Sequence, residues 1–321
     1  MQRPWPSRLA WASRYLAATA AFCWLVGLAL TDRFHWSQFI WWIPHPVLAG
    51  LALPAATIAL MQPDRGTRSS FLRRCGRWSW CLPCLSMVVG ICLRDVGFRR
   101  WNPHADGLQL VQWNASWPGS LGGADAAERL LELEPDIAVI SNPYKLFADG
   151  RGEAWQAAGY DVINLGWFLV ASRLPVTEAR VVTSAKGRIA ALVRTVWRGE
   201  PLTVMPIDLP SEAWASRSDI AERLRDDLAG MPLGDVDIIV GDANIPRGSA
   251  SLGVAFPDHR SAWNDAGRGY GGSWPRIIPL LQIDHVLIGP AIRATQVRFL
   301  DLGSRVHRAQ HVTLRRDDSQ D

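Results

Sequence analysis

The chain has 321 residues, of which 48% are hydrophobic and 20% charged, and it contains 17 tryptophans. This composition excludes a disordered, collagen-like or disulfide-framework protein, and the length fits one large domain or two ordinary ones. The formal net charge of +4 points only weakly to nucleic acid or acidic lipid. All five cysteines and nearly all the long apolar runs lie in residues 1–93. The sequence therefore predicts an apolar N-terminal region followed by a domain of ordinary soluble composition.

Three apolar runs in the N-terminal region have the composition of membrane-spanning helices, which need about 20 apolar residues. We expect transmembrane helices at about residues 15–31, 39–61 and 75–93, which together make a membrane region over residues 1–94. The alternative for the first run is a cleaved signal peptide. Because two further runs follow and no small-residue cleavage site is evident, three spans are favoured.

The arginines around these runs predict the orientation of the chain. Eight of them precede the first span or lie between the second and third, whereas four lie on the opposite side. By the positive-inside rule the N-terminus is cytoplasmic, and the C-terminal domain of this multi-pass cell-membrane protein is extracytoplasmic. The absence of cysteine after residue 93 suits an oxidising compartment. Cys81 and Cys84 have redox-pair spacing, but their place in the third apolar run favours a buried helix.

Beyond a linker at residues 95–107 the periodicity changes to that of a soluble domain, which ends before a short tail at residues 317–321. Apolar alternation and buried runs predict strands at residues 108–116, 136–141, 160–165, 167–172, 179–183, 189–197, 202–207, 236–240, 283–288, 295–299 and 306–314. Helical spacing predicts helices at residues 124–133, 152–158 and 218–228. Since strands far outnumber helices, two sheets packed face to face with helices outside are the economical arrangement.

Polar groups at the ends of these strands are the candidates for chemistry. They are Asn114, the GDAN segment 241–244, Ile283-Asp284-His285 and Gln310-His311. Each of them alone is more simply a turn residue or a core histidine. Their order along the chain, however, matches the motifs of a known family.

The chain resembles the endonuclease/exonuclease/phosphatase superfamily, whose fold is that of DNase I. The landmarks, in order, are Asn114, PDIAVIS at 135–141, ASRLP at 171–175, GDAN at 241–244, Trp263 with Trp274-Pro275, and IDHVL at 283–287. With three spans ahead of the domain, the chain is similar to a bacterial membrane-anchored subgroup that includes a vancomycin/teicoplanin resistance group. The resemblance implies an α+β fold, a four-layer α/β/β/α sandwich over residues 108–316 that follows a three-helix transmembrane region.

The resemblance also implies catalytic roles. Asn114 would position phosphate, Asp242 would activate or orient the attacking water, and Asn244 would stabilise the developing charge. Asp284 would orient His311, because an Asp–His hydrogen bond raises the pKa of the imidazole and fixes its tautomer. Asn114, Asn244 and Asp208 are the expected substrate-binding residues.

The expected metal ligands depart from the family pattern. Asn142 stands where the family has a metal-binding Glu, Gln310 where it has an Asp, and Asp208 where it has a His. Asn142 and Gln310 are therefore expected to be weak ligands. Because Mg²⁺ usually takes one or two carboxylates together with phosphate, metal affinity should fall.

Three hypotheses about function follow. In the first, Asp208 and Asp242 supply the missing negative charge, and a weakened Mg²⁺ or Mn²⁺ site still hydrolyses phosphoesters. In the second, the domain is a pseudoenzyme that binds a phosphorylated envelope ligand without turnover. In the third, the spans themselves carry the function, although only His45 and Arg77 are ionisable near membrane depth. The expected partners are the lipid bilayer and a phosphorylated lipid or envelope precursor, and an outward-facing site excludes genomic nucleic acid.

Overall fold

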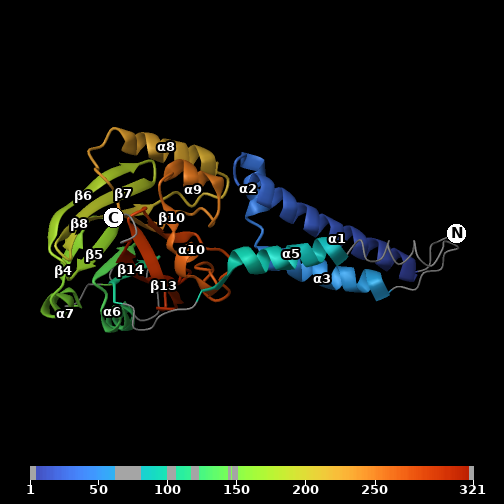
Figure 1. The fold of residues 1–321 in the computed structure, drawn as a ribbon, viewed down its shortest axis with the longest axis horizontal. Helices are drawn as coiled ribbons and strands as arrows, with labels where there is room; N and C mark the ends of the chain where they lie inside the picture. The colour runs from blue at the N-terminus through green and yellow to red at the C-terminus, as the bar shows by residue number, and fades with distance from the viewer. Residues whose placement is uncertain are drawn as a thin grey trace. The chain divides into compact units, whose positions relative to one another are not determined.

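The computed structural model describes residues 5–61, 81–99, 106–116, 123–143, 146 and 151–317. The chain divides into two compact units, Met1–Val96 and Gly97–Asp321 (Figure 1). The first unit consists of helices, and the second contains the sheets with their covering helices.

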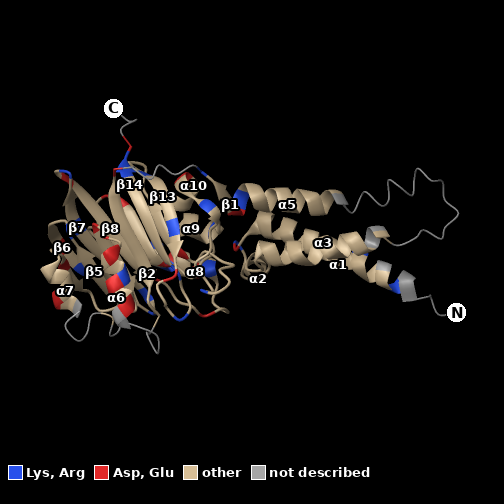
Figure 2. Cartoon of the chain, turned by 90° about the horizontal axis from the view of Figure 1, so that it is seen from below, with Lys and Arg blue, Asp and Glu red and all other residues tan. Residues whose placement is uncertain are grey.

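The first unit contains α1 (Trp5–Leu30), α2 (His35–Trp41), α3 (His45–Met61) and α5 (Cys81–Asp95). The core between α1, α3 and α5 is made largely of small side chains, which allow helix backbones to approach closely in an apolar environment. Ala52 of α3 is fully buried there, and Trp24 of α1 lies so close to Gly90 of α5 that a Cβ on Gly90 would come within 2.5 Å of its ring. In Figure 2 the ribbon along the middle of α1 and α3 is tan, which marks residues other than Lys, Arg, Asp and Glu.

Within the described residues, Trp11–Leu30 is the one helix long and apolar enough to cross a membrane. The bent pair His35–Trp41 and His45–Ile58, which meet at 64°, would be a second span if the two helices act as one. A signal sequence has the same length and apolarity as the first helix. Of the third expected span, residues 75–80 lie outside the described residues, and α5 has 15 residues. The helices thus support one or two spans of the three expected.

The second unit is built on two six-stranded sheets. The order of the first sheet is β10 (Arg260–Ser261), β12 (Asp284–Ile288), β9 (Ile238–Asp242), β8 (Glu200–Asp208), β7 (Arg188–Trp197) and β6 (Val176–Ala185). The order of the second is β13 (Ile292–Leu300), β14 (Ala309–Arg316), β2 (Leu108–Asn114), β3 (Ile137–Ser141), β5 (Phe168–Ser172) and β4 (Asp161–Asn164). A small two-stranded sheet pairs β1 (Val96–Phe98) with β11 (Arg268–Tyr270).

The helices of this unit are α6 (Gly123–Glu132), α7 (Arg151–Ala157), α8 (Arg217–Ala229), α9 (Ala250–Ala255) and α10 (Ala262–Ala266). Alternation along each strand decides what covers each face. On β2, Leu110 faces the core between the sheets, whereas Trp113 packs with residues of α6 and α7. On β8, Val204 faces the same inner core and Ile207 packs against α8. The expected two-sheet sandwich is therefore confirmed, with α6 and α7 on one outer face and α8 and α9 on the other (Figure 1).

Two parallel pairs position the polar strand ends. β2 runs parallel to β3, and β8 runs parallel to β9, so each pair ends at a common edge of its sheet. The β8–β9 pair is unusually close at Gly241, whose φ is +146°. A Cβ on Gly241 would lie 1.8 Å from the carbonyl oxygen of Ile207, so the residue before Asp242 must be glycine.

Candidate functional site

Three carboxylates lie side by side at the edge of the first sheet. Strand register pairs Asp242 with Asp208 on β8 and with Asp284 on β12. All three are buried, with 8% of Asp208, 2% of Asp242 and none of Asp284 exposed. Two unit charges 4 Å apart repel by about 4 kcal/mol at an effective dielectric constant of about 20. This arrangement therefore needs a cation or protons among the acids.

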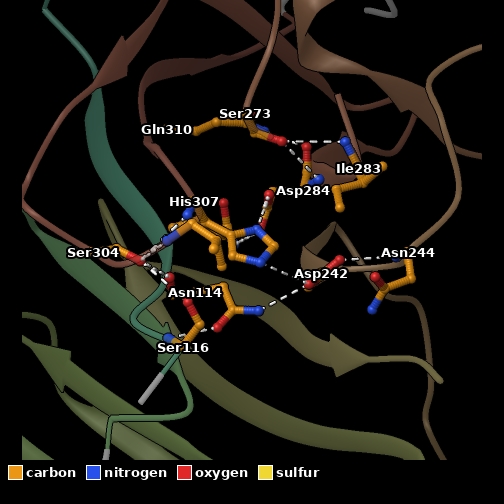
Figure 3. A network of polar contacts seen from close by, with 12 residues as sticks. Asn114, Ser116, Asp242, Asn244, Ser273, Ile283, Asp284, Ser304, His307 and Gln310 are labelled. Atoms are coloured by element: carbon orange, nitrogen blue, oxygen red, sulfur yellow. Dashed lines mark hydrogen bonds and ion pairs between the residues drawn. The ribbon is translucent and has the colours of Figure 1, made fainter. Parts of the chain in front are cut away.

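His307 supplies positive charge to this cluster. It lies just before β14, with Nδ1 2.9 Å from Asp284 Oδ2 and Nε2 3.8 Å from Asp242 Oδ2 (Figure 3). The hydroxyl of Ser304 accepts a 3.3 Å hydrogen bond from the His307 backbone N–H and donates one of 3.3 Å to the carbonyl of Asn114. The loop that carries the imidazole is thus tied to the end of β2.

The expected Asp284–His311 pair is wrong, because the partner of Asp284 is His307. His311 lies inside β14, and its Nε2 is 2.9 Å from Gln109 Oε1. Four residues correspond to about 13 Å along an extended chain, so one histidine at the strand's beginning cannot be exchanged for one in its middle. Both histidines lie within the strand expected at residues 306–314, so the pattern did not distinguish them. In the structure β14 begins at Ala309, so His307 precedes the strand and His311 lies inside it.

Asn114 and Asn244 both meet Asp242, as their placement in the motifs implied. Asn114 Nδ2 donates a 2.8 Å hydrogen bond to Asp242 Oδ2, and the backbone N–H of Asn244 donates one of 2.8 Å to Oδ1. The side-chain amide of Asn244 donates to the carbonyl of Leu209 instead. Both oxygens of Asp242 are therefore held in place before any substrate arrives.

Asp284 is held by residues that sequence reasoning missed or assigned differently. Ser273 Oγ accepts the backbone N–H of Asp284 at 3.2 Å, and Gln112 Nε2 donates to Asp284 Oδ1 at 3.3 Å. Gln310, expected as a weak metal ligand, donates its side-chain N–H to the backbone carbonyl of Asp284. Gln310 thus positions β12, and the residue before His307 is Val306, whose side chain has no metal-binding atom.

Asn142 and Asp208 meet across the site from His307. Asn142 follows β3 with φ +52°, a left-handed conformation that Asn tolerates better than most residues. Its Nδ2 lies 3.1 Å from Asn114 Oδ1 and 3.2 Å from Asp208 Oδ2. Both residues therefore lie at the site, as expected from the motif positions.

The protonation of the cluster follows from burial and these contacts. Burial, followed by the charge of Asp284, raises the pKa of Asp242 to about 7. Burial and the charge of Asp242 raise the pKa of Asp208 well above its usual range. Burial opposes ionisation of Asp284 and His307 too, but their mutual attraction prevails: the pKa of Asp284 is lowered and that of His307 raised to about 9. At neutral pH the site therefore contains an imidazolium between two carboxyl groups.

Two places in the site are candidates for a divalent metal, and they differ in the atoms that they present. The ligand atoms of Asp242, Asp284 and His307 lie within 4.8 Å of one another, so this cluster could hold an ion. The raised pKa of His307 and its 2.9 Å contact with Asp284 place a positive charge beside these acids without an ion. At the place where the family has its Glu, Asn142 presents a nitrogen instead of an oxygen to the site. The donor set there does not fit a metal.

The fold is that of the endonuclease/exonuclease/phosphatase proteins, although no family model and no curated protein matches the sequence. A Leptotrichia buccalis protein of that family covers 65% of this chain and 99% of its own, with TM-score 0.52 and 10% identity. A protein of that family from Beutenbergia cavernae covers 66% of this chain and 72% of its own, with TM-score 0.51 and 16% identity. The mannosyl-6-phosphatase of Bacteroides thetaiotaomicron covers 65% of this chain and 99% of its own, with TM-score 0.50 and 15% identity. At these identities the likeness shows the shared fold alone.

Proposed function

We propose that the second unit hydrolyses phosphoesters at the site formed by Asp242, Asp284 and His307. The observation that carries this proposal is the placement of the His307 imidazole, 2.9 Å from Asp284 Oδ2 and 3.8 Å from Asp242 Oδ2. Burial and the neighbouring charges raise the pKa of Asp242 to about 7 and that of His307 to about 9. Neighbouring groups whose pKa values are pushed apart are typical of acid–base chemistry, and a base works best when its pKa is near the operating pH. The hydrogen bonds to Asp242 and Asp284 support this role, because they fix the positions of both carboxyl groups.

Each residue has a distinct part in the proposed reaction. Asp242 accepts a proton from the attacking water as the water oxygen bonds to phosphorus, and the bond from phosphorus to the leaving alcohol oxygen breaks. The Nε2–H of His307 stabilises negative charge on the phosphoryl oxygens, and the leaving oxygen takes a proton from solvent. Asp284 keeps the imidazole protonated and oriented through the 2.9 Å contact to Nδ1. Asn114 holds the Asp242 carboxylate in place through a 2.8 Å hydrogen bond. Preorganised charge of this kind is the main source of rate enhancement in such sites.

The proposed substrate is a phosphorylated lipid or envelope precursor at the bilayer surface. The loop that leads to Asp284 begins at Ser273, which is bonded to the backbone of the site. This loop exposes Ile277 (79%) and Ile278 (65%). Exposed apolar side chains beside a polar site are typical of a surface that meets lipid. The helix Trp11–Leu30 is long and apolar enough to cross a membrane, which supports a protein tethered to the bilayer. The outward-facing, multi-pass arrangement is part of the proposal.

A second candidate function is binding of a phosphorylated ligand without turnover. The observation that favours it is Asn142, which removes a carboxylate from the place where the family binds its metal. The Asp284–His307 pair beside Asp242 favours hydrolysis, since a carboxyl group that titrates near neutrality next to an oriented imidazole is typical of acid–base chemistry.

Hydrolysis by the full chain in lipid nanodiscs tests the proposal. Phosphomonoester and phosphodiester substrates, including a lipid phosphate, are assayed with EDTA, Mg²⁺ or Mn²⁺. We expect turnover that falls at least about a hundredfold in Asp242→Ala and His307→Ala, because both act on the reacting groups. His311→Ala is the matched control and retains activity, since His311 contacts Gln109 instead of the acids. Binding of the same substrates without turnover under every condition would favour the second candidate.

A further inference from the structure

The side-chain amide of Asn142 fills a position between two oxygen atoms of the site. Its Nδ2 lies 3.1 Å from Asn114 Oδ1 and 3.2 Å from Asp208 Oδ2. Both acceptors belong to buried residues, with 4% of Asn114 and 8% of Asp208 exposed. An amide NH₂ has two hydrogens, one for each of these oxygens. Both acceptors are therefore satisfied by one uncharged group.

We propose that the NH₂ group of Asn142 takes the place of a divalent cation, so that the wild-type chain holds no metal between Asn114 and Asp208. A cation bound there would need the same two oxygens as ligands. It would also be repelled by the partial positive charge on the hydrogens of the Asn142 amide. The amide also costs far less to bury than an ion. The inference concerns the site of the proposed function, but it requires no turnover.

The backbone conformation of Asn142 allows the amide nitrogen to be replaced by an oxygen without other changes. Asn142 has φ +52°, and its N–H donates a 3.0 Å hydrogen bond to the carbonyl of Trp167. Asp tolerates this conformation about as well as Asn. Asn142→Asp therefore keeps the backbone and replaces the NH₂ by an oxygen. Together with Asn114 and Asp208 it forms a set of three oxygen ligands with two carboxylates, which is what Mg²⁺ and Mn²⁺ prefer.

The test measures Mn²⁺ binding and thermal stability of the full chain without substrate. We expect Asn142→Asp to bind Mn²⁺ at least about tenfold more tightly than wild type, because a carboxylate replaces a hydrogen-bond donor. In EDTA the variant melts below wild type, since two acids then face each other, and Mn²⁺ reverses the loss. Adding Asp208→Asn abolishes the gain. Gln156→Glu, an amide-to-acid change at an exposed position on α7, is the matched control and leaves Mn²⁺ binding unchanged.

A second variant covers the case in which Asn142→Asp does not fold. Asn142→Gly adopts the same backbone without strain and removes the amide. We expect Mn²⁺ to raise its melting temperature more than that of wild type. The inference is overturned if wild type binds Mn²⁺ as tightly as Asn142→Asp, or if neither variant gains Mn²⁺ dependence. It is equally overturned if the gain survives Asp208→Asn, because the ion then lies elsewhere. Absence of hydrolysis in wild type would sink the proposed function and leave this inference standing.

Discussion

Asp242 is the residue on which the electrostatics of the site converge. It is flanked by Asp208 and Asp284, approached by His307, and held by Asn114. Burial and the charge of Asp284 penalise its ionised form more than His307 and Asn114 favour it, which is why its pKa lies near 7 instead of the usual 3.8. A group that titrates near neutrality can exchange protons with a substrate, which is the role proposed for Asp242.

The pKa of Asp242 predicts how stability depends on pH. The folded-state pKa of about 7 lies above the unfolded value of 3.8, so the folded state binds more protons in this interval. Stability therefore falls as pH rises from 3.8 to 7. In Asp242→Asn this loss is absent, so the unfolding free energy of the variant should gain on that of wild type by a few kcal/mol at most across the interval. Urea unfolding at several pH values measures the difference, and a constant gap would contradict the raised pKa.

Individual site residues show how far the sequence alone could predict the site. Asp242 and Asp284 were predicted because each borders a strongly apolar strand, a placement that pattern alone reveals. The partner histidine was assigned to His311 because a motif was matched by neighbouring letters inside the last strand. His307 could be found only from the strand's beginning, which the pattern locates poorly. Which atom of the Asn142 amide faces the site depends on neighbours that are far apart in the chain, so a local sequence motif cannot predict it.

At the scale of elements, the β8–β9 pair sets the spacing of the acids. These parallel strands pair Asp208 with Asp242, and their approach is closest at Gly241. Any side chain there would push β9 away from β8 and move Asp242 from Asn114 and His307. The glycine of the GDAN segment is thus a packing requirement as well as a turn residue.

Gly241→Ala should therefore damage both stability and activity. The added methyl group would meet the carbonyl of Ile207, and alanine disfavours a φ of +146°. We expect a loss of about 3 kcal/mol or more in unfolding free energy. Gly253→Ala in α9 is the matched control, since nothing lies within 4 Å of a Cβ there. Chemical denaturation of both variants makes the comparison, and equal stabilities would show that β8 and β9 can separate without cost.

The elements differ in how well the pattern predicted them. A continuous apolar run located β5 (Phe168–Ser172) to within a residue, because both faces of this strand are buried in hydrophobic clusters. The short helices α9 (Ala250–Ala255) and α10 (Ala262–Ala266) were not predicted. Helices of five or six residues are too short to show a helical period. The arrangement of the strands came from the family resemblance, since alternation says nothing about which strands are neighbours.

For the molecule as a whole, orientation is the prediction that matters most. We expect the second unit to face away from the cytoplasm, because the arginines favour a cytoplasmic N-terminus and an odd number of spans. Alkaline phosphatase fused at the C-terminus should be active and green fluorescent protein dark. Fusions within residues 62–74, which the same rule keeps in the cytoplasm, should behave oppositely. A fluorescent C-terminal fusion would contradict both the orientation and the proposed envelope substrate.

The hydrogen bonds that build the site join very distant parts of the chain. Asn114 and Asp242 are 128 residues apart, and Gln112 and Asp284 are 172 residues apart. Folding through such non-local contacts is slow, because long loops must close before any contact rewards them. No early, partly folded species can therefore contain a complete site. Recovery of activity after denaturation should follow the last kinetic phase of refolding. Activity therefore reports when the two-sheet sandwich is completely folded.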